Sequence, residues 1–396
     1  MCANQAQAPR PQLDFAPTRL PTSPRVDPSV YVKLFAFFAF ILGAVVGSFL
    51  NVCIYRMPRD LSVNEPKRSF CPHCKKQIPW TQNIPLFSWL ALRGKCANCH
   101  APIAFRYFGV ELLTALLFLA AWIKSWNSGH WELAFPLWVI LALMVVATFI
   151  DFEHFIIPNE ITWGGVAAGI VLSLGIPSMM GAGSRLMSLV WSAAAAAAGY
   201  ATLWLVVELG KKAFGKKRID LEKPEPFTWT RHGDDADLVA GGQSMKWSDL
   251  FSRETDILVM QVNEARVAEK TYAQTTLTFY YNRLIAGSDE YELDKLDEIS
   301  GVVTGMVIPR EAMGFGDVKF IAAIGAFLGI RAVFFTIMSG SVIGALVGIL
   351  MILIGKREWS ARIPFGPYLA LGAVVWIFFG PQLLDAYWTW IQPAQG

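Results

Sequence analysis

The sequence predicts an all-α polytopic membrane protein with about eight transmembrane helices, a cytoplasmic four-cysteine loop and a small β-rich cytoplasmic insertion. Two observations lead to this prediction. Of the 396 residues, 54% are hydrophobic and only 16% are charged, whereas about 25% are charged in an average soluble protein. The charges are also uneven, because residues 208–305 hold 31 of the 65 Asp, Glu, Lys and Arg residues. We therefore expect a lipid bilayer around most of the chain and water around the rest.

Transmembrane helices account for most of the apolar sequence. A span needs about 20 mostly apolar residues in helical form, because unpaired backbone amides are costly in hydrocarbon. The segments that meet or approach this length are residues 30–54, 108–126, 133–150, 161–177, 186–207, 318–330, 332–354 and 366–391. The sixth of these is short. The first 29 residues contain six prolines and no apolar core, so we expect a disordered leader and not a cleaved signal peptide.

Loop charges predict the orientation, because Lys and Arg in short loops stay on the cytoplasmic side. The loop from Arg56 to Arg106 holds nine basic and two acidic residues, whereas loops 127–132 and 178–185 carry almost no positive charge. Eight crossings then put both chain ends outside the cytoplasm. The expected division is a non-cytoplasmic leader at 1–29, a first helix at 30–55, the cysteine loop at 56–107, helices two to five at 108–207, a soluble insertion at 208–305 and the last three helices at 306–396.

Nucleic acid is not an expected partner. The net charge of +3 is small for a chain of this length, and no basic stripe interleaved with aromatic residues occurs.

The cysteine loop carries the strongest metal signal. Four of the six cysteines form two CxxC pairs, Cys71 with Cys74 and Cys96 with Cys99, separated by 21 residues. Each pair presents two thiolates to one ion, and two pairs complete the tetrahedral shell of a structural zinc. A redox dithiol or unused cysteines are the alternatives, but two matched pairs favour zinc, and the reducing cytoplasm opposes disulfides. Four sulfurs leave no position for a substrate, so the zinc should hold the loop together.

Two acidic residues lie at the ends of apolar segments, where a charge is costly and therefore a candidate for function. Asp151 follows the uncharged run 135–150, and Asp317 ends the sequence Gly314-Phe315-Gly316-Asp317 before an apolar helix. Two facing carboxylates in a poorly solvated site share a proton and can act as base and acid on a water molecule. Helix capping by Asp317 is the alternative. Competing candidates nearby are Glu153, His154 and Glu160.

Several short motifs occur in a distinctive order. They are Gly47-Ser48-Phe49-Leu50-Asn51-Val52, the paired CxxC loop with Asn83-Ile84-Pro85 and Leu86-Phe87-Ser88-Trp89, Tyr107 through Glu111-Leu112-Leu113, the Asp151 segment ending in Pro158-Asn159, Gly314-Phe315-Gly316-Asp317-Val318-Lys319 and Pro364-Phe365-Gly366-Pro367-Tyr368. In this order they resemble the bacterial type IV prepilin peptidases. The resemblance covers nearly everything outside the leader and residues 208–305.

The resemblance implies an inner-membrane aspartic protease of the GxGD type that removes the basic leader from prepilins and pseudopilins, which serve type IV pili and type II secretion. Asp151 and Asp317 correspond to its catalytic pair, and the four cysteines to its zinc ligands. Many members also methylate the new amino terminus with S-adenosylmethionine, and Gly94 and Lys95 correspond to positions associated with that methyl donor. The family often has Asp where this chain has Asn159.

Residues 208–305 depart from the resemblance, because a short loop normally joins those helices. The segment has 13 basic and 18 acidic residues and is long enough for a small domain. Runs at 256–262, 275–281 and 291–296 are rich in β-branched and aromatic residues, with a turn signal at 287–289. We therefore expect a modest β-rich fold.

Two other functions remain open on the sequence alone. One is a peptidase without methylation, in which the zinc loop is purely structural. The other is a membrane transport or assembly protein whose intramembrane acids relay protons.

Overall fold

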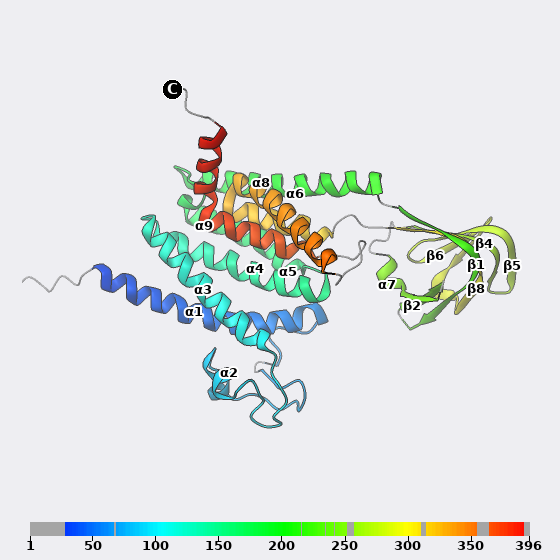
Figure 1. Ribbon diagram of the computed structural model, residues 1–396, viewed down its shortest axis with the longest axis horizontal. Coiled ribbons are helices and arrows are strands. Elements are labelled where there is room, and N and C mark those ends of the chain that lie inside the picture. The colour runs from blue at the N-terminus through cyan, green and yellow to red at the C-terminus, as the bar shows by residue number, and fades with distance from the viewer. Residues whose placement is uncertain are drawn as a thin grey trace, which may run out of the picture.

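The structure is a computed structural model that describes residues 28–66, 69–214, 216–233, 235–240, 242–251, 257–309, 314–354 and 364–391. The expected leader falls almost wholly outside these residues. A helical bundle forms the body of the molecule, with the cysteine loop on one side of it and a β-sheet beyond one end (Figure 1). The bundle helices are α1 (Pro28–Arg56), α3 (Phe105–Asn127), α4 (Ala134–His154), α5 (Asn159–Gly175), α6 (Arg185–Phe214), α8 (Phe315–Leu353) and α9 (Gly366–Ile391).

This is a multi-pass membrane protein by the length and composition of its helices. Among the described residues, six helical segments are long and apolar enough to cross a bilayer: Val32–Arg59, Phe105–Asn127, Trp131–His154, Arg185–Lys212, Phe315–Leu353 and Gly366–Ile391. Helix α5 has only 17 residues, which is short for a span. The expectation of eight separate spans therefore differs from these six segments at α5 and α8.

Helix α8 is assigned as 39 continuous residues, but it is two helices joined at Gly329, whose φ of 81° and ψ of 174° are not helical. A side chain is costly in that conformation, so glycine is required there. A Cβ atom built on Gly199 would lie 3.0 Å from the carbonyl oxygen of Ile321 and 3.4 Å from Cγ2 of Val333. Twelve residues of straight helix span about 18 Å, so the chain must turn back at Gly329. The break lies one residue before the end of the predicted helix 318–330, close to the start of the next predicted helix, 332–354.

Small residues bring the helices close together. A Cβ atom on Gly43 would lie 2.7 Å from the Cα atom of Ala115, and one on Gly47 would lie 2.7 Å from the Cα atom of Glu111. Both glycines are on α1 and both contacts are on α3, so this pair packs almost backbone to backbone. Two glycines four residues apart on one helix permit such a close approach between membrane helices.

The insertion between α6 and α8 forms one antiparallel sheet in the order β3-β2-β1-β8-β4-β5-β6-β7. The strands are β1 (Lys216–His232), β2 (Asp235–Ala240), β3 (Gln243–Lys246), β4 (Leu258–Val267), β5 (Lys270–Phe279), β6 (Arg283–Ala286), β7 (Asp289–Glu292) and β8 (Glu298–Pro309), with the short helix α7 (Trp247–Leu250) between β3 and β4. Its own apolar core includes Phe227, Trp229 and Phe279. The first residue of β1, Lys216, pairs with the last residue of β8, Pro309.

The predicted β-rich insertion is confirmed as a class, but two details were wrong. The first half of the segment, which lacked a strand signal, contributes β1 to β3. Pro224 and Pro226 obscure that signal, because proline removes a ladder donor, and the register shifts between Asp220 and Glu225. The run at 291–296 is strand only at its start, since Leu293–Lys295 is a 3₁₀ turn.

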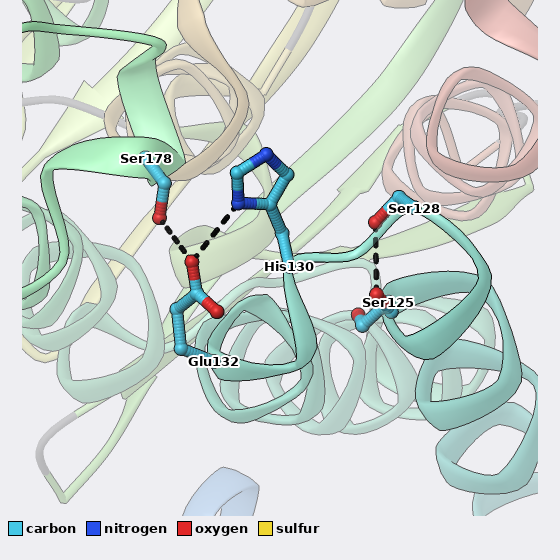
Figure 2. A network of polar contacts seen from close by, with 5 residues as sticks. All are labelled: Ser125, Ser128, His130, Glu132 and Ser178. Carbon is cyan, nitrogen blue, oxygen red and sulfur yellow. Dashed lines mark hydrogen bonds and ion pairs between the residues drawn. The ribbon is translucent and has the colours of Figure 1, made fainter.

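A small polar network joins two loops at the end of the bundle where α4 begins and α5 ends, which we call the far end (Figure 2). The carboxylate of Glu132 accepts a hydrogen bond of 2.9 Å from the hydroxyl of Ser178 and lies 3.1 Å from Nδ1 of His130. Glu132 precedes α4, and Ser178 lies in the 3₁₀ turn after α5. The network therefore ties together the two short loops that carry little positive charge.

Candidate active site

Asp151 lies in the last full turn of α4 and is only 5% exposed. Its Oδ2 atom accepts a hydrogen bond of 2.9 Å from the backbone N–H of Gly366, the first residue of α9. Phe155 ends α4 in the left-handed conformation, and its N–H bonds the carbonyl of Asp151. The carboxylate is thus fixed at the junction of two helices.

Asp317 lies in the first turn of α8 and is 6% exposed. Gly314 is the N-cap of this helix, and no side chain caps it, so the helix-capping alternative for Asp317 does not hold. Its Oδ1 atom is buried and has no hydrogen-bond partner among the described residues. Asp317 interacts electrostatically with Asp151. The structure therefore brings together the two carboxylates that the sequence singled out, 166 residues apart in the chain.

Glycines clear the space around this pair. A Cβ atom on Gly366 would lie 2.8 Å from Oδ2 of Asp151, and one on Gly316 would lie 3.2 Å from Cβ of Ile157. Ile157 also lies 2.9 Å from the same Gly366 position. Any larger residue at Gly366 would displace the Asp151 carboxylate. The functional residue that sequence reasoning missed is Gly366 itself. The sequence Pro364-Phe365-Gly366-Pro367 before an apolar helix was its signal.

The competing candidates for the catalytic residues are not part of this carboxylate pair. Glu153 is exposed and ion-paired with Arg106 on α3, and Glu160 is exposed in the first turn of α5. His154 is half-buried, with its Nε2 atom unpartnered among the described residues. Asn159 accepts a hydrogen bond of 2.7 Å from Nζ of Lys319. This bond links the start of α5 to the segment that carries Asp317.

The four predicted zinc ligands, Cys71, Cys74, Cys96 and Cys99, converge in the loop between α1 and α3. Their sulfur atoms all lie within 4.8 Å of one another, and the Cys71 and Cys99 sulfurs are 3.7 Å apart. A tetrahedral zinc with bonds of about 2.3 Å requires sulfurs about 3.8 Å apart. The donor set and its spacing therefore fit one zinc ion.

The two CxxC turns have the same backbone design. The N–H of Cys71 bonds the carbonyl of Lys76, and the N–H of Cys96 bonds that of Ala101. The fourth residue after each first cysteine, Lys75 or His100, has a left-handed φ of 59° or 56°. Hydrogen bonds from the Lys76 backbone and from the Asn98 side chain lower the pKa of the Cys74 thiol to about 6. This favours the thiolate form that binds metal.

Gly94 lies in a turn, and Lys95 follows it immediately before the second CxxC turn. Gly94 has a left-handed φ of 65°, and a Cβ atom on it would lie 2.9 Å from the ring of Trp89. Lys95 is exposed and pairs with Pro102 in a single bridge. Neither residue belongs to the Asp151–Asp317 pair. Their expected part in methyl-donor binding stays a prediction.

Comparison with known proteins gives the chain's relatives. The profile of the Bacterial Peptidase A24 N-terminal domain matches residues 41–125, and that of the Type IV leader peptidase family matches residues 138–218 and 278–349. The interruption from 219 to 277 falls inside the β-sheet. No solved structure matches the chain.

Several curated relatives carry the name prepilin leader peptidase/N-methyltransferase. The protein from Myxococcus xanthus (strain DK1622) is 48% identical over 147 residues, which are 37% of this chain and 42% of that protein. The protein from Aeromonas hydrophila is 29% identical over 379 residues, with 88% of this chain and 92% of that protein covered. The protein from Pectobacterium carotovorum subsp. carotovorum is 33% identical over 233 residues, which cover 53% of this chain and 75% of that protein. Together with the two profiles, these matches show that the chain belongs to the type IV leader peptidase family.

Proposed function

We propose that this membrane protein is an aspartic endopeptidase that cleaves the leader peptide from prepilins and pseudopilins, and that it also methylates the new amino terminus. The relatives named prepilin leader peptidase/N-methyltransferase support both activities. The observation that carries the peptidase half is the buried pair of carboxylates, Asp151 and Asp317, at the ends of two helices.

Asp151 and Asp317 act together on a water molecule. The low polarity of the site disfavours two adjacent negative charges, so the pair holds one proton between them. The ionised partner takes a proton from water as it adds to the peptide carbonyl, and the protonated partner gives its proton to the leaving amine. The N–H of Gly366 holds one oxygen of Asp151 throughout. The roles of the two residues can exchange, because the proton belongs to the pair.

The topology fits such a substrate. We propose eight crossings of the bacterial inner membrane, with α5 as a short span and α8 divided at Gly329, and an active site facing the cytoplasm. The basic loop around the cysteines supports this orientation. A prepilin has a basic leader followed by an apolar helix, so its scissile bond lies at the membrane boundary. The two aspartates lie at helix ends, which is the depth that this bond requires.

The cysteine loop binds one structural zinc in this proposal. Cys71, Cys74, Cys96 and Cys99 hold the ion, which joins two turns 25 residues apart and leaves no open coordination position. The bound zinc ion would fix the shape of the loop. The methyl group for the second activity would come from a different molecule, S-adenosylmethionine. Metal analysis tests the zinc, because purified protein should contain about one equivalent that is lost when Cys71 and Cys96 are both replaced by serine.

Co-expression with a prepilin tests the reaction and the residues together. We expect the wild type to release the leader, and Asp151→Asn and Asp317→Asn to accumulate full-length prepilin at equal membrane levels. Asp385→Asn, an exposed acid on α9, is the matched control and should cleave normally. Mass spectrometry of the product separates a bifunctional enzyme from a peptidase alone, since methylation adds one methyl group. Normal cleavage by either active-site variant would instead favour the transport or assembly role.

A further inference from the structure

The cysteine loop contains a long segment without charge. Residues 77–92 include no Asp, Glu, Lys or Arg, although the loop as a whole is strongly basic. This segment contains the 3₁₀ turn η2 (Trp80–Gln82) and the short helix α2 (Phe87–Ala91). It lies between the two CxxC turns and includes neither the cysteines nor the aspartates. The proposed zinc site and the peptidase site therefore do not account for its composition.

The uncharged segment exposes large apolar side chains. Trp80 is 75% exposed, Phe87 is 65% exposed and Leu90 is 58% exposed. Phe87 and Leu90 are three residues apart on α2, so they lie on the same face of that helix. Single exposed apolar residues are ordinary, but several large ones close together in the chain mark an interaction surface. The segment therefore has a partner that covers these side chains.

One hydrogen bond fixes the depth of this segment along the bundle. The backbone N–H of Leu86, the residue before α2, donates a bond of 2.7 Å to the carboxylate of Glu111. Glu111 is six residues from the start of α3 at Phe105, and six residues of helix span about 9 Å. Helix α3 is long and apolar enough to cross a bilayer. The segment thus lies beside a span, whereas the β-sheet lies beyond the end of the bundle (Figure 1).

Aromatic packing holds α2 against the start of α3. The ring of Trp89 lies 5.6 Å from that of Phe105 and 5.3 Å from that of Phe108. Its Nε1 atom also donates a hydrogen bond of 3.3 Å to the carbonyl of Ile103. Phe105 is itself exposed. The apolar surface of the span therefore continues onto the cysteine loop, with Trp89 at the junction.

Basic residues lie at both ends of the uncharged segment. Lys75 and Lys76 precede it, Arg93 and Lys95 follow it, and all four are exposed. Arg93 and Lys95 have no ion-pair partner within the part of the chain that the structure describes. Apolar side chains flanked by cations are typical of segments in the membrane interface, where the apolar face enters by about 5–10 Å. The cations there attract anionic lipid headgroups.

We propose that residues 77–92 lie in the membrane interface, with Trp80, Phe87 and Leu90 among the acyl chains and Arg93 beside anionic headgroup phosphates. This interface belongs to the cytoplasmic leaflet in the proposed topology, on which the inference rests. The position of Leu86, about 9 Å along α3, matches the depth of an interfacial segment. The zinc cluster is thereby held at the membrane surface, near the depth of the scissile bond of a prepilin.

Light-activated cross-linking to lipid tests this placement. The full-length, zinc-loaded protein carries p-benzoylphenylalanine in place of Phe87, in vesicles of phosphatidylethanolamine and phosphatidylglycerol. Mass spectrometry should find lipid adducts at this position. The same replacement of Phe49, exposed on α1, should give a yield within about twofold, since both side chains meet acyl chains. Replacement of Tyr281, exposed in the β-sheet insertion, should give about tenfold fewer adducts. Zinc content shows that each labelled protein is folded.

The outcomes separate the placement from the proposed function. Lipid adducts at position 49 but as few at position 87 as at position 281 overturn the placement and leave the topology standing. Adducts with protein in place of lipid at position 87 identify a protein-binding surface and also overturn it. An absence of lipid adducts at position 49 overturns the span of α1 together with the inference. The expected adducts on a protein that cleaves no prepilin overturn the peptidase function alone.

Arg93→Gln tests the contact with anionic headgroups. It should lower the ratio of phosphatidylglycerol to phosphatidylethanolamine among the adducts at position 87 by about twofold to fivefold, because one basic residue near the surface attracts anionic lipid to this extent. Arg266→Gln makes the same change at an exposed position on β4 and should leave the ratio unchanged. An unchanged ratio in Arg93→Gln would overturn the assignment of Arg93 to the headgroups.

Discussion

The aspartate pair and the cysteine cluster are assembled in opposite ways. Asp151 and Asp317 come from helices whose residues meet only when the bundle is packed, and both are almost fully buried. The four cysteines come from two similar local turns within 29 residues, and Cys99 is exposed. One site is positioned by long-range packing, and the other by short hydrogen-bonded turns.

This difference indicates which kind of substitution each site is sensitive to. The aspartate pair depends on the volume of its neighbours, because Gly366 and Ile157 leave no spare room. The cysteine cluster depends on donors to sulfur and on the bound ion, because a loop of this kind has little core of its own. Changes in packing should therefore affect cleavage, and changes in hydrogen bonding should affect metal affinity.

The largest expected effect is at the carboxylates. Asp317→Asn should lower the rate of prepilin cleavage about a thousandfold, because general acid–base catalysis is lost. The double variant with Asp151→Asn should be no slower than either single variant, because the pair works as a unit. Single-turnover cleavage in detergent measures both. Additive losses would show that the two acids act independently.

A packing change tests the same site without touching its charges. Gly366→Ala should lower the cleavage rate about thirtyfold to a hundredfold, because a 1 Å displacement of a catalytic group has an effect of this order. The added Cβ atom would lie 2.8 Å from Oδ2 of Asp151. Gly164→Ala is the matched control, since no atom lies within 4 Å of the corresponding position. Zinc content should stay at the wild-type level in both proteins.

A hydrogen-bond change tests the cysteine cluster. Asn98 donates to the sulfur of Cys74 and accepts a bond of 2.9 Å from Lys76. Asn98→Ala should weaken zinc binding about tenfold, as is typical when a group that orients a metal ligand is removed. Competition with a chelator measures the affinity. Asn64→Ala, in the same loop and exposed, should leave it unchanged, and a loss of cleavage in Asn98→Ala would contradict the separation of the two sites.

The smallest effect is expected at the far end of the bundle. Glu132→Ala removes the contacts to Ser178 and His130 (Figure 2), and should lower the free energy of unfolding by about 1 kcal/mol. Ser178→Ala, which removes one of the two contacts, should have a smaller effect. Thermal unfolding in detergent gives the order. A change in the cleavage rate at low temperature would show that this end is coupled to the aspartates.

The sequence predicted the helices and the chemical residues better than their surroundings. Apolar length alone marked the helices, and α9 begins and ends where the sequence predicted. The CxxC spacing specified its cluster because each turn is local. Two hydrogen bonds could not be predicted, because each depends on how two distant helices pack. One runs from the Gly366 amide to Asp151, and the other from the buried Asn51 to the carbonyl of Tyr107. Strand β1 was missed because its prolines and charges obscure the alternation of a strand.

The pairing of Lys216 with Pro309 has an evolutionary consequence. Because the sheet begins and ends at neighbouring positions, both of its connections to the bundle lie side by side. A lineage can acquire, enlarge or discard such a module while α6 and α8 keep their separation. The same catalytic body is thereby free to diversify its soluble appendage.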